Sequence, residues 1–163
     1  MAEGKTPANL LFLREEDLRQ GIELLFYAYR DFTAEADAML AQLGFGRAHH
    51  RVIYFVGRKP GMTVSELLDI LKITKQSLSR VLGQLVREGY ITQRPGTADR
   101  RQRLLELAPT GAELARRLTE DQRALVARAY RAAGAEAVDG FRRVLLGLVN
   151  DADRGRFAGA ARR

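Results

Sequence analysis

The amino-acid sequence predicts a mainly α-helical protein with one small β-hairpin. Apolar residues recur at spacings of three and four through most of the 163 residues, which is the period of an amphipathic helix. Two short helical segments are joined by a connection of three residues, 72–74. Two strand-like segments, 90–92 and 104–107, follow directly and enclose a loop rich in arginine.

The first predicted element is one long helix over residues 14–43. Its apolar residues keep the helical spacing until Gly44-Phe45-Gly46 breaks the pattern. A helix of about 30 residues is long for a small monomer and needs a surface to pack against, often one from a second subunit. The preceding residues, 1–13, are predicted to be a flexible arm.

Two more helices are predicted before the connection. The first spans 47–58 and ends at the turn Lys59-Pro60-Gly61. The second starts after Thr63, because Thr63 and Glu66 have the spacing of a capping box, in which each side chain bonds the other residue's backbone N–H.

A fourth helix is predicted after Thr74, which can act as its N-cap, and Gly89 lies just beyond its end. Two short helices joined by such a turn form the helix-turn-helix pattern. The buried stripe of the fourth helix should be Leu78, Val81, Leu82 and Leu85. The opposite face carries Gln76, Ser79, Arg80, Gly83 and Arg87, with Lys75 at its edge.

This opposite face is a candidate for reading base edges, since Gln suits adenine, Arg suits guanine and Ser suits either. A solvated polar stripe on any amphipathic helix looks similar. Gly83 either lets a ligand or backbone come close or packs tightly against another helix.

Positive charge is concentrated in the segment that runs from the fourth predicted helix through the loop between the two predicted strands. Residues 72–103 hold eight Lys or Arg and two acids, which gives +6 of the total +7. Such a patch suits a polyanion such as nucleic acid, although a solvated face without a partner is the alternative. A β-hairpin after a helix-turn-helix is a winged helix, and Arg100 and Arg101 could then neutralise phosphates or enter a narrow groove. Asp99 is assigned to holding a neighbouring arginine in place.

The remaining residues, to about position 157, are predicted to be helical. Thr110 and Glu113 have the spacing of a second capping box, and Gly134 and Gly140 are candidate interruptions.

Composition excludes several classes of function. The absence of cysteine excludes disulfides and thiolate sites, and the sequence holds neither an HExxH nor a GxSxG motif, so no enzyme is expected. His49 and His50 are adjacent and point in different directions on a helix, so they cannot easily bind one metal ion together, and no metal site is expected. No cofactor is expected either. No apolar run is long enough to span a membrane and no signal peptide is recognised, so we expect a cytoplasmic protein without membrane contact.

The order of elements resembles the MarR family of bacterial transcription regulators (multiple antibiotic resistance regulators). The resemblance is carried by MTVSELLDILKITKQSLSRVLGQLVREGYI at 62–91 and DRRQRLLELAPTG at 99–111. The second segment follows the family's wing pattern, although Ala108-Pro109-Thr110-Gly111 departs slightly from its Thr-x-x-Gly. Gly96-Thr97-Ala98 stands where the family often has an acid and an arginine, so which arginine occupies the wing tip stays open.

The resemblance implies a homodimer with one structural domain per subunit. Residues 14–44 would be a dimerisation helix, 45–107 the winged helix-turn-helix and 108–163 the C-terminal dimerisation helices. Two winged helices would read a pseudo-palindromic site in double-stranded DNA. Family members are commonly repressors released by a small ligand, often an aromatic one.

The residues expected at each site follow from this interpretation. The expected DNA-binding residues are Thr63, Ser65, Thr74, Lys75, Gln76, Ser77, Ser79, Arg80, Thr97, Arg100 and Arg101, with Asp99 structural in the wing. The candidate wall of an effector pocket is Tyr27, Tyr29, Arg30, His49, His50, Tyr54 and Phe55, for which core and interface packing is the alternative.

Two other functions compete with this interpretation. A winged helix can serve as a protein-interaction module, but the basic wing argues against it because protein interfaces are usually depleted of charge at their core. Single-stranded RNA binding usually needs aromatic stacking platforms, and residues 72–103 contain one aromatic residue, Tyr90.

Overall fold

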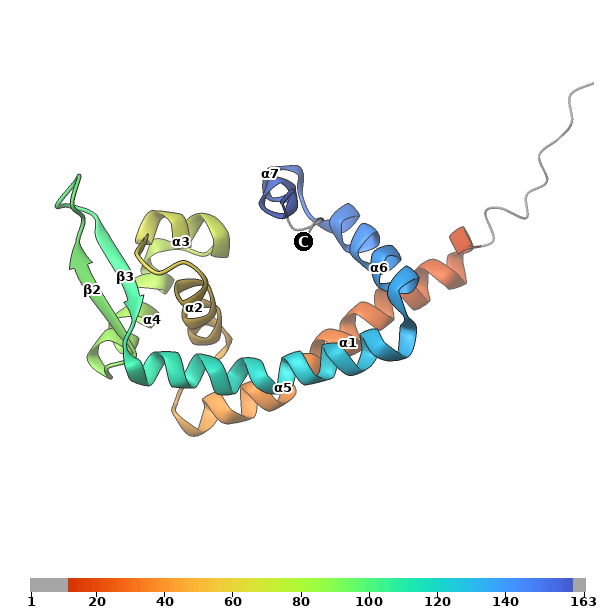
Figure 1. Ribbon diagram of the computed structural model, residues 1–163, viewed down its shortest axis with the longest axis horizontal. Coiled ribbons are helices and arrows are strands. Elements are labelled where there is room, and N and C mark those ends of the chain that lie inside the picture. Colours follow the sequence, from red (N-terminus) through yellow and green to blue (C-terminus); the bar gives the residue numbers. More distant parts are fainter. Residues whose placement is uncertain (1–11, 160–163) are drawn as a thin grey trace, which may run out of the picture. The chain divides into compact units, whose positions relative to one another are not determined.

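The computed structural model describes residues 12–159, so the predicted arm lies almost entirely outside the described residues. The chain divides into two compact units, Met1–Gln122 and Arg123–Arg163. Figure 1 labels α1 to α7, β2 and β3. The first unit contains α1 (Glu15–Gln42), α2 (Arg47–Arg58), β1 (Met62–Thr63), α3 (Val64–Leu71), α4 (Lys75–Arg87), β2 (Ile91–Pro95), β3 (Arg103–Leu107) and the start of α5 (Pro109–Ala133). The second contains the rest of α5, α6 (Ala135–Leu148), α7 (Asp151–Arg154) and the 3₁₀ turn η2 (Gly155–Phe157).

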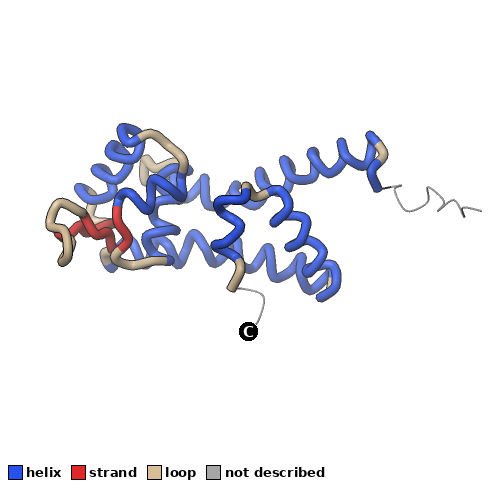
Figure 2. Tube along the Cα trace, turned by 90° about the horizontal axis from the view of Figure 1, so that it is seen from above, coloured by secondary structure: helices blue, strands red, loops and turns tan. Residues whose placement is uncertain are grey.

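The mainly helical class is confirmed, and Figure 2 shows the strands gathered in one small sheet. Its order is β1-β3-β2 and both pairings are antiparallel. The hairpin pairs Ile91 with Leu107 and Pro95 with Arg103. Strand β1 was not predicted, because two residues are too few to show an alternating pattern.

The helix starts follow local side-chain chemistry. The capping box at α3 is confirmed: Thr63 Oγ1 accepts from the Glu66 N–H at 3.2 Å, and Glu66 Oε2 accepts from the Thr63 N–H at 2.8 Å. The second predicted box is wrong. Helix α5 begins at Pro109, so Thr110 lies inside its first turn, and Glu113 instead binds Arg116 at 2.8 Å. A proline at the first helical position loses nothing, because its missing N–H would have had no helical partner.

The helix ends follow glycine. Gly44 and Gly89 both have positive φ, at 71° and 81°, and lie just beyond α1 and α4 as predicted. Of the two candidate interruptions near the C-terminus, Gly134 separates α5 from α6 with φ 86°, whereas Gly140 lies within α6.

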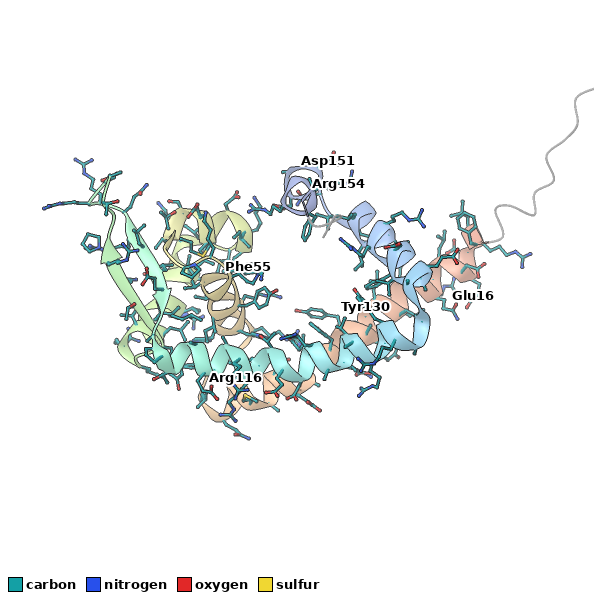
Figure 3. The ribbon with its side chains drawn as sticks, in the orientation of Figure 1. Glu16, Phe55, Arg116, Tyr130, Asp151 and Arg154 are labelled. Atoms are coloured by element: carbon teal, nitrogen blue, oxygen red, sulfur yellow. The ribbon has the colours of Figure 1, made fainter. Side chains whose placement is uncertain are left out.

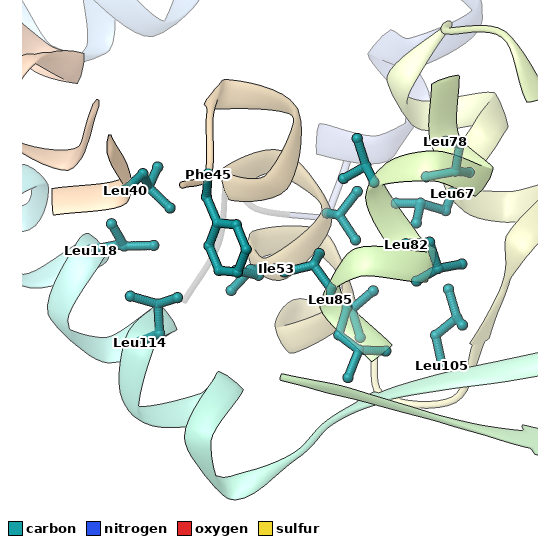
Figure 4. Close-up of a cluster of buried hydrophobic side chains, with 14 of the residues drawn as sticks. Leu40, Phe45, Ile53, Leu67, Leu78, Leu82, Leu85, Leu105, Leu114 and Leu118 are labelled. Atoms are coloured by element: carbon teal, nitrogen blue, oxygen red, sulfur yellow. The ribbon is translucent and has the colours of Figure 1, made fainter. Parts of the chain in front are cut away.

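The core of the first unit joins the helix-turn-helix to the end of α1 and the start of α5. Figure 4 shows Phe45 between the leucines of α1 and α5 on one side and Ile53 of α2 on the other. The four residues of the predicted α4 stripe are all buried, at most 4% exposed: Leu78, Val81, Leu82 and Leu85. The opposite face of α4 is thereby turned outward.

No helix within residues 12–159 combines the length and the apolar character needed to cross a membrane.

Candidate nucleic-acid interface

The outward face of α4 carries polar side chains that no other part of the described chain engages. Lys75, Gln76, Ser79 and Arg80 are exposed and have no side-chain hydrogen bond or ion pair within residues 12–159. A Cβ atom on Gly83 would meet only the Arg87 guanidinium, at 3.2 Å, so no other helix of the described chain packs against it. The face is therefore free to approach a ligand.

The hydroxyl groups at the starts of α3 and α4 differ in whether their proton is still free to donate a hydrogen bond. Thr63 donates its proton toward Glu66 at 3.4 Å. Thr74 donates to Ser77 Oγ at 2.9 Å and accepts from the Ser77 N–H at 3.1 Å. Ser77 accepts through its oxygen and keeps its own proton, and the exposed Ser65 has no partner within the described residues. Because a phosphate needs donors, Ser65 and Ser77 suit it better than the two threonines do.

The turn at the wing tip is fixed by hydrogen bonds to its main chain. Asp99 Oδ1 accepts from the backbone N–H of Arg101 at 2.9 Å, and Gly96 N–H donates to Gln102 O at 3.0 Å. A Cβ on Gly96 would lie 2.5 Å from the Asp99 carbonyl oxygen, so this position requires glycine. Asp99 thus bonds the main chain of Arg101 and not its guanidinium.

The cationic groups of the tip remain available. Arg100, Arg101 and Thr97 are exposed and make no side-chain bond or ion pair in the part of the chain that the structure describes.

Two of the eight basic side chains in residues 72–103 are already paired. Arg94 of β2 donates from Nη2 and Nε to Glu106 of β3, at 2.8 and 3.1 Å. Lys72 binds Asp69 at 3.1 Å. The count of charges over residues 72–103 therefore overstates the free positive charge, because the two pairing acids, Asp69 and Glu106, lie outside that segment.

The candidate pocket residues on α1 make contacts close to the surface. The Arg30 guanidinium lies 4.7 Å from the Tyr27 ring centroid and pairs with Asp31. Tyr29 Oη accepts from Arg51 Nη2 at 3.2 Å. Tyr29 therefore contacts α2, whereas these contacts of Tyr27 and Arg30 are with other residues of α1.

The candidate pocket residues on α2 make separate contacts. Tyr54 and Phe55 pack edge to face, with centroids 5.2 Å apart (Phe55 is labelled in Figure 3). His50 is half-buried, and this burial lowers its pKa below the ordinary 6.5. His49 stacks on Phe45 and bonds Gln84 of α4. The last contact was missed by sequence reasoning, since no local pattern connects residues that are 35 positions apart.

Within residues 12–159 no group of three or more histidine, aspartate or glutamate side chains lies in an arrangement suited to a metal ion.

Known proteins resemble this chain in sequence. A family model described as MarR family matches residues 43–102. The HTH-type transcriptional regulator PetP of Rhodobacter capsulatus is 50% identical over 156 residues, which is 94% of each chain.

Known structures resemble it in fold. FabT of Streptococcus pneumoniae, solved in complex with DNA, superposes with a TM-score of 0.72 at 21% identity, covering 81% of this chain and 94% of that one. A mutant of E. coli MarR complexed with operator DNA has a TM-score of 0.62 at 21% identity, covering 86% and 99%. The identity to PetP along nearly the whole length, together with this winged helix-turn-helix fold, shows that the chain belongs to the MarR family of helix-turn-helix transcriptional regulators, which are not enzymes.

Proposed function

We propose that the chain acts as a homodimer that binds a pseudo-palindromic operator in double-stranded DNA and represses transcription until a small ligand releases it. The observation that carries this proposal is the outward face of α4, followed in the chain by a wing tip with unpaired arginines. Base-edge groups and phosphate-binding cations then lie on consecutive elements of one unit. The fold is shared with FabT and MarR, whose structures were solved with DNA.

Exposed apolar residues support the dimer. Helix α1 has no buried residue before Thr33, and Ile22 and Phe26 are 70% and 64% exposed. Apolar surface of this extent usually marks an interface. In the second unit the large apolar side chains left exposed are Tyr130, Phe141, Val144, Leu148 and Phe157. A second copy of the chain would cover both sets.

Aromatic side chains on α1 and α2 support a ligand that is itself aromatic. Tyr27, Tyr29 and Tyr54 are each between 41% and 49% exposed, so part of each ring is open to contact with a flat molecule. No cofactor is proposed, and we place the protein in the cytoplasm, where bacterial DNA lies.

The test is a titration of the purified protein onto a fluorescent duplex from its own upstream region, with a scrambled duplex as control and salt varied. Binding roughly a thousandfold tighter to the native duplex, with a steep salt slope, supports a specific regulator. Equal and weak binding to both duplexes contradicts sequence-specific recognition of this region. No binding at low salt favours the protein-interaction module instead. The same assay screens ligands by the DNA that they release.

A further inference from the structure

His49 connects the start of α2 to the recognition helix α4. Its Nδ1 accepts from the Gly46 N–H at 3.0 Å, so the ring proton must sit on Nε2. Nε2–H then donates to Gln84 Oε1, 2.8 Å away. Gln84 in turn donates from its amide nitrogen to Glu88 Oε1 at 3.1 Å. A backbone N–H, which can only donate, thereby sets the direction of every bond in the series.

The imidazole is held in this orientation by aromatic packing. It stacks on the buried Phe45 with ring centroids 4.7 Å apart and an interplanar angle of 17°. Phe45 in turn packs edge to face with Tyr90, which lies just before β2, with ring centroids 5.2 Å apart. A ring fixed on one face by an aromatic neighbour cannot turn away from Gln84 without losing that stacking.

Gln84 lies where it can control how α4 is rotated about its own axis. It follows Arg80 by four residues, so the two side chains are about 40° apart around the helix, at the flank of the outward face. The leucines on the buried side hold α4 against the core, but apolar contact is not directional. A hydrogen bond is directional, and this one joins α4 to α2.

We propose that His49 is a positioning residue for DNA recognition, acting through Gln84 to set the rotation at which α4 presents Gln76, Ser79 and Arg80. This proposal rests on the proposed function of α4 as the recognition helix. Hydrogen bonds to base edges tolerate little angular error, whereas phosphate contacts by flexible cations tolerate more. Loss of the His49–Gln84 bond should therefore weaken discrimination between native and scrambled duplexes. The salt-dependent part of DNA binding, which comes from phosphate contacts, should stay the same.

Two single variants remove the bond in different ways. His49→Asn keeps an oxygen close to the Nδ1 position for the Gly46 N–H but is too short to reach Gln84. Gln84→Leu removes the acceptor and keeps a similar volume. Each should reduce the native-to-scrambled affinity ratio about five- to tenfold, which corresponds to one hydrogen bond. The double variant should lose no more than either single one, because both substitutions remove the same contact.

A swapped variant provides the matched control. Gln84→Glu combined with Glu88→Gln keeps net charge, keeps an acceptor for His49 Nε2–H and keeps an amide donor for residue 84. This variant should recover the wild-type ratio to within about twofold, which a loss caused only by destabilisation would not do. The salt slope should be the same in all variants, and circular dichroism with thermal melting confirms that each is folded.

Nuclear magnetic resonance of ¹⁵N-histidine protein tests the bond itself, and the chain has only two histidines to assign. The proposal requires the Nε2–H form of His49, and an Nδ1–H form would overturn it. Unchanged ratios in both single variants, or fully additive losses, would also overturn it while the wild type still discriminates. If the wild type itself does not discriminate, the proposed function fails first.

Discussion

Arginine side chains on α4 and on the wing have different expected roles, and single substitutions separate them. Arg80→Ala removes a base-reading group, so the protein should lose discrimination by about 1–3 kcal/mol while its salt slope stays the same. Arg101→Ala removes a phosphate contact, so native and scrambled duplexes should both bind more weakly and the salt slope should fall by about 1. Arg116→Ala on α5, where the guanidinium is paired with Glu113 and Glu120, is the control. Wild-type behaviour of the first two variants would refute the assigned interface.

Gly111 shows how one missing side chain joins the wing to α5. A Cβ atom at this position would overlap the carbonyl oxygen of Tyr90, which accepts a hydrogen bond from the Ala108 N–H. Gly111→Ala should therefore lower the free energy of unfolding by about 1–3 kcal/mol, the usual cost of forcing atoms into a packed site. Urea denaturation measures it. Gly140→Ala, within α6 and with nothing within 4 Å of its added Cβ, should be neutral or slightly stabilising.

His50 makes stability depend on pH. Burial lowers its pKa below 6.5, with Asp37 opposing and Arg51 reinforcing this effect. The unfolded chain then takes up a proton more readily than the folded one, so stability is lost as pH falls below about 6.5. The free energy of unfolding, measured with urea, should differ less between pH 7.5 and pH 5.5 in His50→Gln than in the wild type. The lowered pKa of Glu66, held by Lys59 and the Thr63 N–H, acts only as pH falls below 4.5, outside this window.

At the scale of elements, the chain of the second unit turns back to cap its own helix. Arg154 of α7 donates to the carbonyl oxygens of Leu146, Gly147 and Val149, at 2.9 to 3.2 Å, and pairs with Asp151 (Figure 3). These are carbonyls at the end of α6 that have no helical partner. Favourable charge at a helix C-terminus adds to the effect.

Arg154→Ala should unravel this end of α6. The expected loss is about 1 kcal/mol, because the group is partly exposed and water can replace it. Hydrogen exchange of the amides at the end of α6 should rise, while exchange in α4 stays the same. Protection unchanged in α6 would contradict the capping role. Arg156→Ala, two residues further on, is a nearby comparison in η2.

Element boundaries could be predicted where local chemistry sets them. Helix α2 begins and ends at the predicted residues, since glycines flank it on one side and a Pro-Gly turn on the other. The start of α5 was wrong because Thr110 and Pro109 offer competing signals and the proline prevails. Contacts between elements were missed, as with Arg94 and Glu106, because they depend on hairpin register.

At the scale of the whole molecule, association should be required for DNA binding. Ile22→Glu places a charge on the exposed apolar face of α1, where a second copy would bury it. The variant should sediment as a monomer, and its affinity for a two-site operator should fall at least about a hundredfold. Glu23→Lys, on the same helix but polar already, is the control. A dimeric Ile22→Glu variant with normal affinity would exclude this face from the interface.

The wing tip has a consequence for how such a regulator diverges. Its turn is fixed by Gly96, by the Asp99 carboxylate and by the main chain of Arg101, so the side chains at 100 and 101 contribute nothing to its shape. Mutation at these two positions is then free of a folding penalty. A duplicated gene could therefore acquire a different overall affinity for DNA through this loop while keeping the rest of its protein unchanged.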